Sequence, residues 1–218
     1  MKIIFFGPQG SGKGTQVELL AKKFNIPAIS PGVIYRQEIT KKTKLGKIAA
    51  KYLNKGELAP SDLTNEIMKN RLKKIDCKKG FILDGYPRDL TQAQCLDKIT
   101  KIDLAIEIIL SNKECLKRFS GRQNCICGTV YHIKFNPPKK KGICDKCGKS
   151  LFIREDEGLE AIKKRLQIYS QKTKPLLKEY QERGILIKIN GNQSIKEVEK
   201  EIGDKLKVYF NNPLKRGK

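Results

Sequence analysis

The sequence lacks any long apolar run, and none approaches the roughly 20 residues that a helical membrane span requires. It also leaves no room for a cleavable leader, because the opening Met-Lys-Ile-Ile-Phe-Phe passes directly into a glycine-rich loop. The first absence excludes a helical membrane anchor, and from the second we expect no secretory signal. We therefore expect a cytoplasmic protein whose seven cysteines are reduced unless they hold a metal.

Acidic residues are scarce: 23 stand against 46 lysines and arginines, which gives a net charge of +23. Such an excess is typical of proteins that bind polyanions. However, the lysines are scattered along the whole chain and form no single block, as on an ordinary solvated surface. We expect no dedicated nucleic-acid interface and no membrane contact.

The order of apolar patterns predicts an α/β fold. Strand-like runs fall at 2–6, 26–29, 80–84, 104–110 and 185–189. Helical patterns separate them, at 16–24, 33–41, 45–54, 61–75, 90–98, 112–120, 158–172, 175–183 and 194–209. This alternation indicates a doubly wound, parallel five-stranded sheet flanked by helices. A chain of 218 residues can bury such a core without a partner, so we expect a monomer.

The first strand leads into a loop with the pattern of a phosphate cradle. The loop reads Gly7-Pro8-Gln9-Gly10-Ser11-Gly12-Lys13-Gly14-Thr15. Its glycines let backbone N–H groups crowd around an anion, and the helix that follows adds the partial positive charge of its N-terminus. Strand, loop and helix together predict a nucleotide-binding P-loop.

Magnesium needs a carboxylate from elsewhere, because Gly14 stands where a P-loop normally places the serine or threonine that holds the ion. Asp84 is the candidate, since it follows the apolar run 80–83 and would reach the carboxyl end of a buried parallel strand. The alternative is that Asp84 is only a turn residue before Gly85.

Residues 121–157 interrupt the alternation and are rich in glycine, proline, cysteine and lysine. Two cysteine pairs, Cys125/Cys127 and Cys144/Cys147, have the layout of a four-cysteine zinc site. Only one residue separates the cysteines of the first pair, where two are usual, so metal-free thiols are the alternative. His132, the single histidine, could also replace Cys125. The three isolated cysteines, Cys77, Cys95 and Cys115, are expected to be ordinary buried or half-buried residues.

Several ordered motifs resemble those of the long-form adenylate kinases, within the nucleoside monophosphate kinases. Besides the P-loop, the motifs are Asp84-Gly-Tyr-Pro-Arg88 with Gln92, Ser120-Gly-Arg122, Tyr131-His132, Arg154 with Asp156, Arg165, Tyr169 and Thr173-Lys-Pro175. The resemblance implies magnesium-dependent phosphoryl transfer from ATP to AMP, giving two ADP. It also implies a core (1–29, 61–120 and 158–218), a monophosphate-binding insert (30–60) and a zinc-bearing lid (121–157).

The resemblance also implies a role for each matching residue. Catalytic residues would be Lys13, Asp84, Arg88, Arg122, Arg154 and Arg165. ATP would contact Gly10, Ser11, Gly12, Lys13, Gly14, Thr15, Arg118 and Arg122. AMP would contact Gly32, Arg36, Glu57, Leu58, Ala59, Gly85, Arg88, Gln92, Arg154 and Arg165. Arginine suits these tasks because it stays charged and grips phosphate oxygens through two donors at once.

The acceptor site departs from the family pattern, Ser-Thr-Gly-Asp before an arginine. Here the segment reads Ser30-Pro31-Gly32-Val33, so a hydroxyl and a carboxylate are missing. Gln92 favours adenine, because its amide can pair with the N6 and N1 edge. A pyrimidine (UMP/CMP) monophosphate kinase is the alternative within this class. From another class, the alternative is a zinc-ribbon P-loop NTPase that binds nucleic acid.

Overall fold

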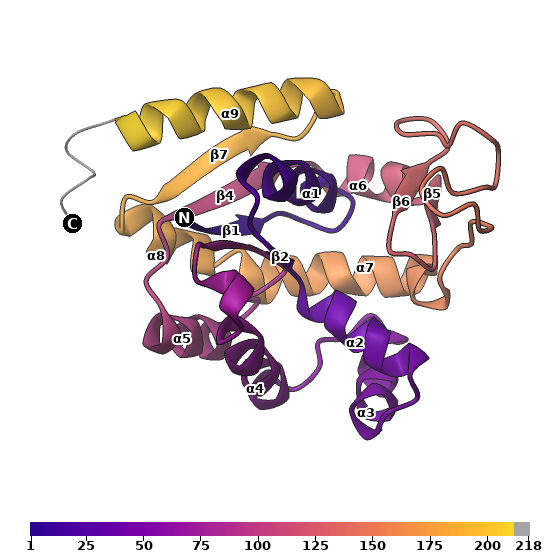
Figure 1. Ribbon diagram of the computed structural model, residues 1–218, viewed down its shortest axis with the longest axis horizontal. Helices are drawn as coiled ribbons and strands as arrows, with labels where there is room; N and C mark the ends of the chain where they lie inside the picture. The colour runs from indigo at the N-terminus through magenta and orange to yellow at the C-terminus, as the bar shows by residue number, and fades with distance from the viewer. Residues whose placement is uncertain (212–218) are drawn as a thin grey trace.

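A computed structural model describes residues 1–211, and Figure 1 shows a central sheet between two layers of helices. Within these residues the sheet has five parallel strands in the order β2-β3-β1-β4-β7. Their bounds are β1 (Lys2–Phe6), β2 (Ala28–Ile29), β3 (Phe81–Asp84), β4 (Leu104–Ile109) and β7 (Leu186–Asn190). The predicted doubly wound parallel sheet is confirmed.

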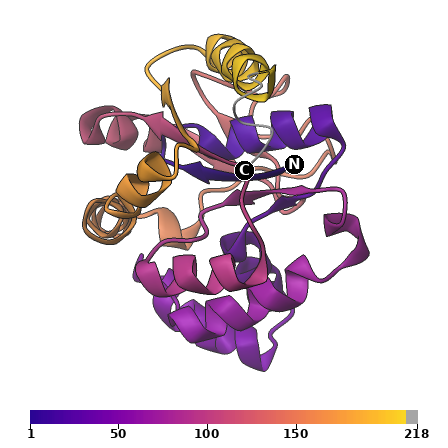
Figure 2. The ribbon, with the colours of Figure 1, turned by 90° about the vertical axis from the view of Figure 1, so that its left-hand side faces the viewer.

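Each face of the sheet has its own apolar core, because successive strand side chains point to opposite faces. Ile3 and Phe5 pack with helices α1 (Lys13–Phe24) and α9 (Ile195–Asn211). Ile4 and Phe6 pack on the other face, against helices α4 (Ser61–Leu72), α5 (Leu90–Ile99) and α8 (Leu176–Glu182). Figures 1 and 2 show these helices above and below the sheet. Among residues 1–211, no helix is long and apolar enough to cross a membrane.

Two segments extend beyond the sheet and its covering helices (Figure 1). Helices α2 (Pro31–Thr40) and α3 (Lys44–Leu53) share a small core that contains Tyr35, Ala49 and Ala59. The second segment contains an antiparallel ribbon of β5 (Arg122–Asn124) and β6 (Val130–His132). Helices α6 (Asn112–Phe119) and α7 (Leu159–Ile168) lie on its two sides along the chain.

The bounds of most predicted elements differ in the structure by a few residues, and three of these differences are instructive. The strand expected at 26–29 pairs only over Ala28–Ile29, and the helix expected at 61–75 ends at Leu72 before a short 3-10 turn, η1 (Ile75–Cys77). The helix expected at 158–172 becomes α7 followed by a π-helical turn, η3 (Tyr169–Thr173). In that turn the Lys174 N–H donates to the Tyr169 carbonyl, and Pro175 supplies no N–H to continue a regular helix.

Candidate active site

The loop between β1 and α1 folds as a compact cradle, and α1 begins at Lys13. Two glycines in it are required by close packing as well as by backbone conformation. A Cβ on Gly7 would lie 2.8 Å from the Ile108 carbonyl oxygen, and one on Gly10 would lie 2.9 Å from that of Cys115. Both glycines have positive φ, which residues with a side chain rarely adopt. The loop therefore lies directly against β4 and α6, at the carboxyl edge of the sheet.

Strand β3 brings Asp84 beside this loop, because Asp84 pairs in register with Phe5 of β1. Its carboxylate lies 3.9 Å from Lys13 Nζ. Burial lowers the pKa of Lys13, and the negative charge of Asp84 opposes that shift. Asp84 Oδ1 is buried and has no hydrogen-bond partner within residues 1–211. A free carboxylate oxygen beside a phosphate cradle suits the oxygen-ligand preference of magnesium.

Five arginines from distant parts of the sequence gather in front of the cradle. They are Arg36, Arg88, Arg122, Arg154 and Arg165, which come from α2, the loop after β3, β5, the segment before η2 (Glu155–Glu157) and α7. Burial is the largest cause that lowers the pKa of Arg36, to about 10, and the positive charge of Arg154 adds to it. Like charges held this close are costly without a counter-ion, so the cluster is suited to a polyanion.

Two carboxylates that sequence reasoning did not assign to the site partly neutralise these arginines. Asp156 lies 2.6 Å from Arg165 and 3.2 Å from Arg154. Glu157 pairs with Arg154 and lies 3.3 Å from Arg122. Both acids are buried. The signal that could have identified them is the run of three acids after Arg154, at 155–157, in a chain short of acids.

Arg118 lies on α6, the helix against which Gly10 of the cradle packs, and over an aromatic ring that sequence reasoning also missed. Its guanidinium carbon is 5.3 Å from the ring centre of Phe135, and its Nη2 donates to the Gly191 carbonyl at 2.9 Å. Phe135 in turn stacks on His132, with 4.6 Å between ring centres. This arrangement offers a flat cationic and aromatic platform, which suits a nucleobase.

The residues predicted to contact AMP divide into two groups. Four of them, Leu58, Gly85, Arg88 and Arg165, line one cavity together with Lys13 of the P-loop. The other six lie outside the lining of this cavity. Arg36 and Arg154 belong to the arginine cluster, Glu57 pairs with Lys164 at 2.6 Å, and Ala59 is buried in the α2–α3 core. Gly32 packs under the Arg36 guanidinium, and Gln92 is buried with its amide oxygen accepting the Arg88 N–H at 2.9 Å.

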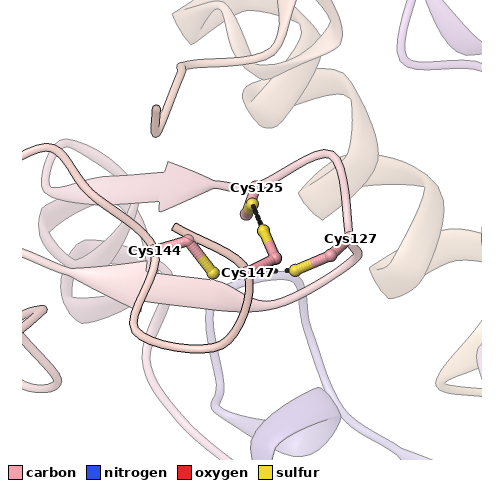
Figure 3. Close-up of side chains that lie close together, drawn as sticks. All are labelled: Cys125, Cys127, Cys144 and Cys147. Atoms are coloured by element: carbon pink, nitrogen blue, oxygen red, sulfur yellow. Dashed lines mark hydrogen bonds between the residues drawn. The ribbon is translucent and has the colours of Figure 1, made fainter. Parts of the chain in front are cut away.

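The four predicted metal ligands converge at one point in the ribbon segment (Figure 3). Their sulfur atoms all lie within 4.8 Å of one another, with 3.3 Å between Cys125 and Cys147 and 3.6 Å between Cys127 and Cys144. A tetrahedral zinc ion bound at about 2.3 Å would place its sulfurs about 3.8 Å apart. The donor set and its spacing therefore fit zinc, despite the short Cys-x-Cys spacing.

His132 does not take part in the cluster, so the alternative in which it replaces Cys125 is wrong. Its Nδ1 accepts the N–H groups of Lys134 and Phe135, at 3.0 and 3.2 Å. Cys125 is instead brought to the cluster by a tight turn, in which the Cys125 N–H donates to Thr129 and the Gly128 N–H donates to Cys125. The backbone of the turn, rather than the spacing alone, directs the thiol.

A cradle for one polyphosphate does not by itself need five half-buried arginines beside it. A second phosphorylated molecule facing the first does, and this pairing is typical of P-loop kinases. The family model described as "Adenylate kinase" matches residues 5–185. The chain is 47% identical to the adenylate kinase of Caldanaerobacter subterraneus subsp. tengcongensis, over 93% of this chain and 94% of that protein.

Two further adenylate kinases are similar to a comparable degree. That of Methanosarcina barkeri is 46% identical over 96% of this chain and its own full length. That of Archaeoglobus fulgidus is 44% identical over 93% of this chain and 96% of its own. The chain therefore belongs to the adenylate kinase family.

Proposed function

We propose that this chain transfers the terminal phosphoryl group of ATP to AMP, reversibly and with magnesium, to give two ADP. The observation that carries the proposal is a single cavity in which the P-loop lysine, Lys13, faces Arg88 and Arg165. Chromatography of a reaction with ATP, AMP and magnesium should find two ADP formed for each AMP consumed. Free phosphate in place of the second ADP would instead indicate a hydrolase.

In this proposal the two substrates bind at opposite ends of the arginine cluster. The P-loop residues Gly10, Ser11, Gly12, Lys13, Gly14 and Thr15 hold the ATP phosphates, with Arg122 beside them, and Arg118 and Phe135 hold the adenine. Arg36, Arg88 and Arg165 hold the phosphate of AMP. Arg154 lies between the two groups because it approaches Arg122, through their shared partner Glu157, and Arg165, through Asp156.

Catalysis then requires positioning and charge stabilisation more than proton transfer, since an ionised AMP phosphate already carries the attacking oxygen. Lys13 and the arginines stabilise the charge that spreads over the moving phosphoryl group. Asp84 would hold magnesium through its free carboxylate oxygen. When bound, the ion neutralises charge on the ATP phosphate oxygens. Asp156 and Glu157 release arginine donors to the substrates as these arrive.

We also propose that residues 30–60 and 121–157 act as parts that move against the core formed by 1–29, 61–120 and 158–218. Arg36 belongs to the first part, and Arg122 and Arg154 belong to the second. Closure of both around the substrates would complete the charge cluster and exclude water, which would otherwise accept the phosphoryl group. All these groups come from one chain, so we propose that a monomer is active.

In this proposal acceptor choice depends on the start of α2, where the sequence departs from the family pattern. Pro31 is buried as the first residue of that helix, while Val33 is 46% exposed. We propose that AMP is the acceptor, because Arg36, Arg88 and Gln92 remain in the sequence. The Nε2 group of Gln92 lies 3.4 Å from the Ser61 hydroxyl, a long hydrogen bond that a base could replace.

Replacing Pro31 with threonine should sharpen the preference for AMP over CMP and UMP by up to about tenfold. The reason is that a hydroxyl at this position restores one hydrogen bond to the acceptor base, worth roughly 0.5–1.5 kcal/mol. The measurement is the ratio of kcat/KM values for the three acceptors, with KM for ATP as the control. An unchanged ratio would show that position 31 does not contact the base.

For the cysteine cluster we propose a structural zinc ion that holds the ribbon segment together. Purified protein should contain about one zinc per chain, and Cys147→Ser should release it and lower the melting temperature of this segment while the sheet persists. Metal analysis and calorimetry test both expectations, with Cys95→Ser as the matched control because Cys95 lies outside the cluster. Metal-free protein whose melting is unaffected by a chelator would contradict the proposal.

A further inference from the structure

The π-helical turn η3 makes a contact with the active site that the proposed chemistry does not use. Thr173, its last residue, is buried, and its hydroxyl donates to the carbonyl oxygen of Arg88 at 2.9 Å. The two residues are 85 positions apart in the sequence, and both line the same cavity. π-helical turns are rare in proteins, and those that occur are frequently found at functional sites.

Arg88 lies on the loop between β3 and α5 and is held at three points. Its backbone N–H donates to the Gln92 amide oxygen at 2.9 Å, and its Nε donates to the Gly85 carbonyl at 2.9 Å. The third contact is the one from Thr173. The first two partners belong to the same short stretch of chain as Arg88, so they can move with it. Thr173 alone of the three ties Arg88 to a part of the cavity lining that is distant in the sequence.

The sequence around Thr173 favours this connection. Because Pro175 has no N–H, the helix cannot continue with regular bonds, and Lys174 instead donates to Tyr169, five residues back. Leu176 and Leu177 then anchor the chain in the apolar core under the sheet. The turn is therefore fixed on its far side by packing, and a hydroxyl on it is a firm reference point for Arg88.

We propose that Thr173 is a positioning residue, which sets the Arg88 guanidinium in the geometry that grips the acceptor phosphate. The inference rests on the proposed function, in which Arg88 binds that phosphate. It predicts that loss of the Thr173 hydroxyl impairs the kinetic parameters for AMP and leaves the KM for ATP nearly unchanged. It also predicts that the effect of Thr173 passes through Arg88.

The first part of the test compares three variants. Thr173→Val keeps the shape but lacks the donor, and it should raise KM for AMP or lower kcat, with kcat/KM for AMP falling about fivefold or more. Its KM for ATP should stay within about twofold. Thr173→Ser keeps a hydroxyl and should restore most of the activity. Ser170→Ala, at an exposed position of the same turn, is the matched control and should behave as wild type.

The second part is a double-mutant cycle with Arg88→Ala. If Thr173 acts through Arg88, then Thr173→Val should have no further effect on kcat/KM for AMP once Arg88 is absent. Independent, additive losses would overturn the inference and leave only a structural role. A Thr173→Ser variant as impaired as Thr173→Val would also overturn it. The same holds for equal losses of kcat/KM for ATP and for AMP together with a lowered melting temperature.

Comparison of the Arg88→Ala and Thr173→Val variants separates the proposed function from the positioning role of Thr173. If it lowers kcat/KM for AMP while Thr173→Val does not, the proposed function stands and the positioning role fails. If Arg88→Ala leaves the AMP parameters unchanged, the acceptor assignment in the proposed function fails, and the role of Thr173 fails with it.

Discussion

Replacement of Lys13 by methionine should lower kcat by a factor of about 10³ or more, equivalent to about 4 kcal/mol of transition-state stabilisation. The Lys13 ammonium is buried at the start of α1, 3.9 Å from Asp84 and beside the phosphate cradle. Methionine keeps the length of the side chain but not the charge. Steady-state kinetics with ATP and AMP measure the effect.

The control is Lys22→Met, an exposed lysine near the other end of the same helix, which should retain wild-type activity. The melting temperature of the Lys13 variant should be maintained or raised, because burial disfavours the charged form of this lysine. A loss of activity smaller than tenfold would contradict the role assigned to Lys13.

Replacement of Arg88 by alanine should lower kcat/KM for AMP by about 10²- to 10³-fold, as expected for loss of a preorganised charged donor. The Arg88 guanidinium is buried, and this burial lowers its pKa, with the positive charge of Arg165 acting in the same direction. Its charge is therefore unfavourable in the free protein and becomes favourable when a phosphate arrives.

Calorimetry with each nucleotide should show AMP affinity reduced and ATP affinity within about twofold of wild type. Arg183→Ala is a suitable control, since Arg183 is exposed and pairs with Asp97, away from the cavity lining. An Arg88 variant that loses ATP affinity and keeps AMP affinity would place this arginine at the donor side instead.

The fold was predictable from the sequence because its strongest signals are local. Apolar runs such as 80–83 and 104–110 are typical of buried strands, and the helices between them favour parallel pairing. The P-loop was predictable for the same reason, since glycines at fixed positions serve one backbone shape. Asp84 followed from topology, because parallel strands deliver their carboxyl ends to one edge of the sheet.

Contacts between distant segments were not predictable in this way. The pairing of Arg122 with Glu157 depends on how residues 121–157 fold back, and no periodicity carries that information. The same is true of Glu57 with Lys164, and of Phe135 beneath Arg118. The π-helical turn was missed because its pattern of apolar residues is that of an ordinary helix, although Pro175 marks where the helix must change.

The central claim is tested most directly by a coupled assay in which ATP and magnesium are offered with AMP, CMP, UMP and GMP in turn. AMP should have the highest kcat/KM of the four, with no ATP consumed when the acceptor is omitted. A higher kcat/KM for CMP or UMP would contradict the assignment of AMP as the acceptor, and steady ATP consumption without any acceptor would contradict phosphoryl transfer as the function.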